Sequence, residues 1–180
     1  MNHAVLSSLL LLAPALPEPP PALKVVRVEL SVRAERDGFL SVRARELELS
    51  GAHSSPRRIR LRGTAGGEPV EFEPRLERRD DADARVERWN AGTLALEPAS
   101  RPNSFRVAGP GFSARLDAVT ASDGPHYELE GGGLSLRSSG RAPNILWSGT
   151  AAPVWTARRL AELSALLTAL QLEPPRRVRR

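Results

Sequence analysis

The amino-acid sequence predicts a mainly β protein, an antiparallel β-roll, jelly roll or sandwich built from hairpin repeats, with one amphipathic helix near its C-terminus. Two observations lead to this prediction. Short runs in which apolar and polar residues alternate recur at roughly the 8 to 12 residue spacing of all-β folds. Beyond residue 156, apolar residues recur instead at steps of three and four, the period of a helix. We therefore expect a β-domain over residues 23–155, a helix over 156–173 and a basic tail over 174–180.

The first strands are indicated by strict alternation from Val26 to Val32, which is typical of a half-buried strand. Asp37-Gly38 then offers the turn residues of a hairpin into a second strand over 39–49. The apolar phase of that second strand slips by one residue, which predicts a β-bulge near Arg45-Glu46. The charged stretch 78–85 has no apolar period, so we expect an exposed loop there. The remaining expected strands cover residues 58–62, 69–72, 93–97, 104–108, 112–119, 126–130 and 134–137.

The expected helix carries a row of leucines and many alanines, which favour helix, and the pair Pro174-Pro175 ends it. One interpretation is a helix that covers one end of the β core and protects an open sheet edge. The alternative is a helix that docks an envelope protein partner. The residues that would then contact the partner are Leu160, Leu163, Leu167 and Leu170. A membrane-surface role is disfavoured because the polar face is mostly Ala, Ser and Thr rather than basic.

The N-terminal segment predicts export. An apolar run over residues 4–16 contains Ala13-Pro14-Ala15, so we expect a signal peptide at 1–15 and a Pro-rich leader at 16–22. The run is shorter than the roughly 20 residues that cross a bilayer, so we expect no transmembrane span in the mature chain and a periplasmic location. No Lys or Arg precedes the run, which leaves anchoring at the inner membrane by an uncleaved N-terminus as the alternative.

Composition disfavours several classes of protein. The chain has no cysteine, which excludes disulfides and thiolate metal sites. Its net charge of +5 comes largely from residues 156–180, where six Arg face two Glu, and this leaves the rest of the chain near neutral. A basic face for nucleic acid is therefore not expected.

No catalytic pattern is found. Past the expected signal, the only histidines are His53 and His126, each isolated among turn residues and without the spacing of metal ligands. The Gly-x-Ser-x-Gly turn of hydrolases is missing, and the single lysine, Lys24, belongs to no phosphate-binding loop. Alternation places Glu128 and Glu130 on a solvent face rather than together as paired catalytic carboxylates. We therefore expect a protein that is not an enzyme and has no cofactor or metal.

Two segments share one layout. Residues 42–63 and 113–131 each run from an alternating strand through a polar turn to a second strand that ends in glycine. With an export signal in front, this layout resembles the periplasmic lipopolysaccharide-transport proteins of the OstA/LptA/LptC superfamily. The resemblance covers residues 26–137 and implies an open β-roll whose apolar interior receives lipid acyl chains. The positions that it implies for lipid contact are Val42, Leu47, Leu49, Ile59, Leu61, Phe112, Leu116, Tyr127, Leu129, Leu134 and Leu136.

The chain departs from that superfamily in its Leu-rich C-terminal helix, in the charged stretch 78–85 and in lacking the full-length membrane anchor of the LptC branch. The function that we expect is binding or transfer of an amphipathic lipid in the cell envelope, during outer-membrane biogenesis. The alternative is an envelope scaffold or adaptor that docks a protein partner through its C-terminal helix.

Overall fold

The structure is a computed structural model that describes residues 25–35, 38–81, 83–122 and 124–179. The expected signal peptide 1–15 and Pro-rich leader 16–22 lie outside the described residues. Within them, the chain is mainly β, with one antiparallel sheet and a single helix, as expected. The helix is α1, Ala157–Leu172. The strands are β1 Val26–Ala34, β2 Phe39–Ala44, β3 Leu47–Ser55, β4 Arg58–Ala65, β5 Glu68–Phe72, β6 Arg75–Asp80, β7 Ala84–Ala91, β8 Leu94–Pro98, β9 Ser104–Gly109, β10 Phe112–Ala121, β11 Gly124–Gly131, β12 Leu134–Arg141, β13 Asn144–Ala151 and β14 Arg177–Arg179.

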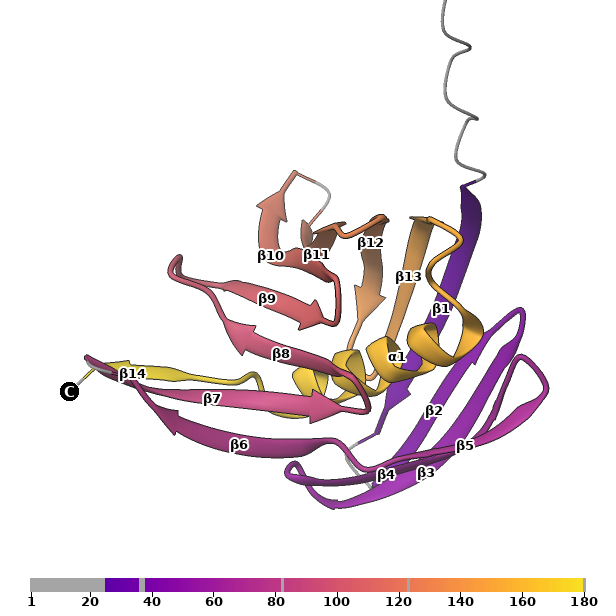
Figure 1. The fold of residues 1–180 in the computed structure, drawn as a ribbon, viewed down its shortest axis with the longest axis horizontal. Coiled ribbons are helices and arrows are strands. Elements are labelled where there is room, and N and C mark those ends of the chain that lie inside the picture. Colours follow the sequence, from indigo (N-terminus) through magenta and orange to yellow (C-terminus); the bar gives the residue numbers. More distant parts are fainter. Residues whose placement is uncertain (1–24, 36–37, 82, 123, 180) are drawn as a thin grey trace, which may run out of the picture.

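The sheet is built almost entirely from strands that are neighbours in sequence. Its order is β14-β7-β8-β9-β10-β11-β12-β13-β1-β2-β3-β4-β5, and β6 pairs with β7. The β13–β1 pair joins the first and last long strands. Only Glu73 and Pro74 separate β5, which pairs with β4, from β6, which pairs with β7. The two ends of the sheet are thus linked by one bent stretch of chain, and the sheet curls around α1 (Figure 1).

Two predictions about local structure were wrong. The stretch 39–49 is a hairpin of β2 and β3 rather than one bulged strand, because the chain reverses at Arg45-Glu46. A reversal shifts the apolar phase just as a bulge does. The charged stretch 78–85 is also not a loop, since most of it lies in β6 and β7, which pair from Arg75↔Asn90 to Asp80↔Arg85. Strand β6 is charged on both faces because it lies at a solvent-exposed edge, where charge discourages pairing with other chains.

Helix α1 begins after Thr156, whose hydroxyl accepts from the Arg159 backbone N–H at 3.4 Å. Its position matches the expected helix, but its surroundings do not. Every residue from Ala161 to Leu170 is buried, and the helix packs against β1, β3, β4, β5, β7 and β8. It therefore fills the interior of the roll rather than covering one end. No helix in the described part of the chain is long and apolar enough to span a membrane.

The face of α1 that carries alanine, serine and threonine explains this burial. The Ser164 and Thr168 hydroxyls donate to the backbone carbonyls of Leu160 and Ser164, at 2.6 and 2.8 Å, so neither needs water. Alanines complete this face, and their small side chains allow strands to approach closely. A helix that is apolar or internally satisfied on all sides is expected to be buried.

Candidate functional site

The eleven residues proposed for lipid contact converge on the interior of the roll. Nine of them belong to the hydrophobic core cluster that also contains the α1 leucines, and the other two, Phe112 and Tyr127, are half-buried and pack against it. The nine buried residues are Val42, Leu47, Leu49, Ile59, Leu61, Leu116, Leu129, Leu134 and Leu136. Alternation thus identified the interior face correctly, and the structure places α1 in the space that these residues surround.

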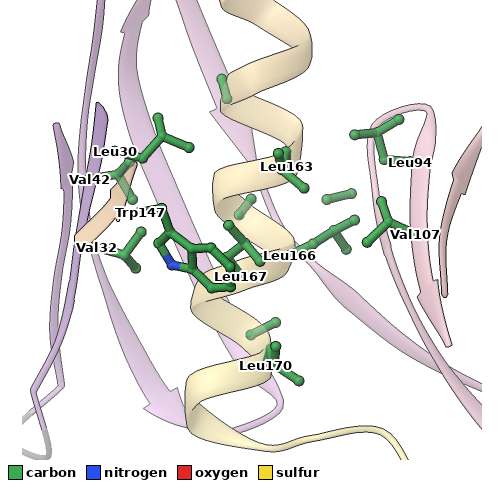
Figure 2. Close-up of a cluster of buried hydrophobic side chains, with 14 of the residues drawn as sticks. Leu30, Val32, Val42, Leu94, Val107, Trp147, Leu163, Leu166, Leu167 and Leu170 are labelled. Carbon is green, nitrogen blue, oxygen red and sulfur yellow. The ribbon is translucent and has the colours of Figure 1, made fainter. Parts of the chain in front are cut away.

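Helix α1 lies between opposite walls of the sheet. Figure 2 shows Leu30, Val32, Val42 and Trp147 on one side of α1, and Leu94 and Val107 on the other. The stripe proposed for partner docking is part of this packing: Leu163, Leu167 and Leu170 are at most 2% exposed. In this arrangement these leucines contact the protein's own core, so docking of a partner through them would require α1 to leave the interior. Leu160, the fourth residue of the stripe, is half-buried.

A small cleft opens where Leu160 lies. It has a volume of about 120 Å³ and is formed by the start of β1, the β2–β3 turn and the first turn of α1. Val28, Leu47 and Ala157 contribute apolar walls, and Val26 at the edge is 52% exposed. Four charged residues complete the lining, namely Arg27, Glu29, Arg45 and Glu46. The cleft is thus an apolar opening with charged groups beside it.

The opposite end of α1 is held by an ion pair to the sheet. Arg57, in the β3–β4 turn, donates from Nε to both carboxylate oxygens of Glu173 at 3.0 and 3.1 Å, and from Nη2 to one of them at 2.6 Å. These hydrogen bonds hold the pKa of Glu173 below its ordinary value, and its partial burial opposes them. The Trp89 indole N–H donates to the Glu173 carbonyl at 2.9 Å. The C-terminal end of α1 is therefore anchored to both β7 and the β3–β4 turn.

A buried carboxylate ties the middle of α1 to the sheet. Glu162 is only 3% exposed and accepts from the backbone N–H and the hydroxyl of Thr93 at 3.2 and 2.7 Å. The adjoining residue, Gly92, has a φ of +59°, and a Cβ there would come within 2.5 Å of Glu162 Oε1. The sequence pattern did not predict this contact. An acidic residue inside an otherwise apolar helical segment was the available signal.

Several polar atoms in the described structure are buried without a hydrogen-bond partner. They include the indole Nε1 of Trp147, a residue only 1% exposed, and both amide atoms of Gln171 near the end of α1. A buried polar group without a partner costs about 1–3 kcal/mol, so each calls for an explanation.

The two candidate histidines do not form one site. His53 Nε2 lies 2.8 Å from the Glu35 carbonyl oxygen, and His126 Nε2 lies 3.0 Å from Glu128 Oε1. Among the described residues, no three His, Cys, Asp or Glu side chains are grouped so that they could hold a metal ion.

Comparisons of the chain with protein-family models, curated proteins and solved structures find no match. What the site can bind therefore follows from the chemistry of this chain's own residues.

Proposed function

We propose that this protein is a non-enzymatic, exported protein that binds an amphipathic lipid, or helps to transfer it, in the bacterial envelope. The acyl chain would occupy the interior of the roll in place of α1. One observation carries the proposal: the apolar interior is filled by a single helix, while the strands around it pair with one another and not with that helix. The resemblance to lipopolysaccharide-transport proteins agrees with this function but covers only the strands.

The dimensions of α1 suit the exchange. Its 16 residues make it about 24 Å long. One leaflet of a bilayer holds acyl chains within about 15 Å, half the thickness of the hydrocarbon core. An acyl chain therefore fits within the length that α1 occupies, and burial of its methylene groups against the same side chains replaces part of the burial lost when the helix leaves.

The two ends of α1 differ in a way that favours entry at the N-terminal end. The C-terminal end is held by Arg57 and Trp89, as described above. The first turn lies beside the 120 Å³ cleft, with Ala157 and Leu160 in its lining. We expect the helix to move away from the cleft and to stay attached at Glu173.

The unpartnered indole N–H of Trp147 supports the same site. It lies within the apolar interior, where no described group accepts its hydrogen bond. A lipid carries ester or amide carbonyls next to its acyl chains, and such an oxygen would accept from this N–H. The Trp147 N–H, which has no partner while α1 fills the interior, would then donate a hydrogen bond to the bound lipid.

A reversible lock on α1 tests the proposal directly. A Cβ built at Gly66, in the β4–β5 turn, lies 3.3 Å from the Cβ of Ala157, close to the Cβ separation of a disulfide. Because the chain has no cysteine, the G66C/A157C variant contains a single thiol pair. We expect the reduced variant to take up a fluorescent fatty-acid analogue and the oxidised variant to take up none, with reduction restoring uptake.

The G66C single variant controls for strain at this position, where φ is +60°. Equal uptake by the oxidised and reduced double variants would show that α1 need not move. No uptake by the unmodified protein, together with no lipid in organic extracts of the protein purified from an envelope fraction without detergent, would overturn the proposed function itself.

A further inference from the structure

The end of the roll where α1 begins is built from turns that contact one another. The Gly66 N–H of the β4–β5 turn donates to the Glu46 carbonyl of the β2–β3 turn at 2.7 Å. Just before α1, the Trp155 indole N–H donates to the Gly132 carbonyl of the β11–β12 turn at 2.8 Å, and its ring stands edge-on to Phe112. The 120 Å³ cleft opens among these turns. We call this part of the molecule the cleft end.

Exposed valines gather at the cleft end. Of the six large apolar side chains that are exposed in the described structure, three lie there: Val25, Val26 and Val154, with exposed fractions of 58%, 52% and 53%. Val26 lines the cleft, and its strand partner Ala151 precedes Val154 by only three residues. A single exposed apolar side chain is common on protein surfaces, but a group of them beside an apolar opening is typical of a binding surface.

Arginines stand around these valines. Arg45, in the β2–β3 turn, lines the cleft and is exposed. Arg158, in the first turn of α1, is also exposed. Arg159 donates from Nη1 to the Val154 carbonyl at 3.4 Å, and its guanidinium lies 5.8 Å from the centre of the Phe112 ring. The surface is thus an end of the roll, built from turns, and not a face of the helix.

Carboxylates at the cleft end balance part of this charge. The exposed ones are Glu29, Glu46 and Glu68. Glu29 is already paired with Arg27 at 3.5 Å. The carboxylate nearest Arg158 is that of Glu162, which lies 3.9 Å away, is buried and accepts from Thr93. Neither Arg45 nor Arg159 has a carboxylate partner among the described residues, so both guanidinium groups are available to an anion outside the protein.

A bilayer is the partner that fits this surface. A lipid that enters through the cleft must come from a bilayer, because water does not dissolve its acyl chains, and the surface that borders the cleft then faces that bilayer. Exposed apolar side chains enter the headgroup region, and guanidinium groups match the geometry of lipid phosphates. We propose that the cleft end docks on a bilayer that contains anionic lipids. This inference rests on the proposed function, which makes the cleft the point of lipid entry.

Co-sedimentation with vesicles tests the proposal on the protein purified from an envelope fraction. The vesicles consist of phosphatidylcholine with or without phosphatidylglycerol. We expect saturable binding that is tighter when phosphatidylglycerol is present and about fivefold weaker in R45Q, because one arginine no longer contacts the anionic surface. V25D and V154D should each weaken binding at least about fivefold, since they replace an apolar contact with a negative charge. Thermal unfolding of each variant shows whether it is folded.

The matched controls lie at the other end of α1. Val178, in β14, is 58% exposed, the same fraction as Val25. Arg101, in the β8–β9 turn, lines a cavity together with Pro174, which follows α1. V178D and R101Q should therefore bind vesicles as the unmodified protein does. Every variant keeps the same residues before Val25, so binding through that segment would be equal in V25D, V154D and V178D.

Three results would overturn the proposal: no binding to either kind of vesicle, equal binding to both, or equal binding by V25D, V154D and V178D. The oxidised G66C/A157C variant separates docking from lipid uptake. Vesicle binding that this variant retains while it takes up no fatty-acid analogue supports docking as a step of its own. If the unmodified protein takes up the analogue from solution but binds no vesicles, docking is wrong and the proposed function stands.

Discussion

Arg57 and Glu173 are 116 residues apart in the chain, yet the guanidinium of one holds the carboxylate of the other through three hydrogen bonds of 2.6 to 3.1 Å. The pair joins the β3–β4 turn to the end of α1. Glu87 of β7 adds a third charge, with an oxygen 3.7 Å from Arg57 Nη2. The anchor of the helix is therefore electrostatic, and it should respond to pH.

Acidification should weaken this anchor. The Arg57 hydrogen bonds lower the pKa of Glu173 from its ordinary value near 4.5 in the folded state. The unfolded chain then binds the proton first, so the stabilisation is present above about pH 4.5 and is lost as pH falls through the lowered folded pKa. We expect urea unfolding of E173Q to show a smaller loss of stability over this range than the unmodified protein. Identical pH profiles would contradict this role, and E71Q, which removes an exposed carboxylate of the β4–β5 pair, is the matched control.

Gly92 should be intolerant of any side chain because of Glu162. Both Gly92 and Gly67 have positive φ, +59° and +83°, but only at Gly92 would a Cβ meet another group. We expect G67A to cost about 1 kcal/mol of unfolding free energy from backbone strain, and G92A to cost more. Removal of the Glu162 side chain relieves the clash, so a double-mutant cycle of G92A and E162A should show a favourable coupling. Additive losses would mean that the two residues do not interact.

The sequence predicted the interior of the sheet better than its connections. Alternation from Val26 to Val32 correctly indicated which face of β1 is buried, because burial of one face imposes a period of two. It could not separate a bulge from a reversal at Arg45-Glu46, since both shift the phase by one residue. Strand β6 gave no signal because most of its side chains are exposed, so its conformation is imposed mainly by backbone pairing with β7.

The surroundings of α1 depended on information that is not local. The Ala, Ser and Thr positions of α1 suggested a polar face, whereas hydroxyl bonds to preceding carbonyls allow that face to be buried. The Arg57–Glu173 pair requires that the β3–β4 turn and the end of α1 meet in space.

The packing of α1 should be essential to the stability of the free protein. Leu166 is fully buried between the walls of the roll. We expect L166A to lower the unfolding free energy by about 2–5 kcal/mol, the usual range for a buried Leu to Ala change. The control is L146A on the outer face, where the side chain is exposed and the change should be within about 0.5 kcal/mol. Equal effects in chemical denaturation would show that α1 is not packed as described.

The single tyrosine of the chain provides a direct probe of the interior. Tyr127 stacks on Trp147 with ring centroids 6.0 Å apart, and burial raises the pKa of its phenol above the ordinary value of 10.0. Because the unfolded chain loses this proton first, the contribution to stability is complete below about pH 10 and declines as pH rises through the folded pKa. We expect titration of phenolate absorbance to give a higher midpoint for the folded protein than for the protein in urea. The Y127F variant should keep the ring packing and lose the tyrosine-dependent part of the alkaline decline, and a folded midpoint at or below the unfolded one would contradict the burial of this side chain.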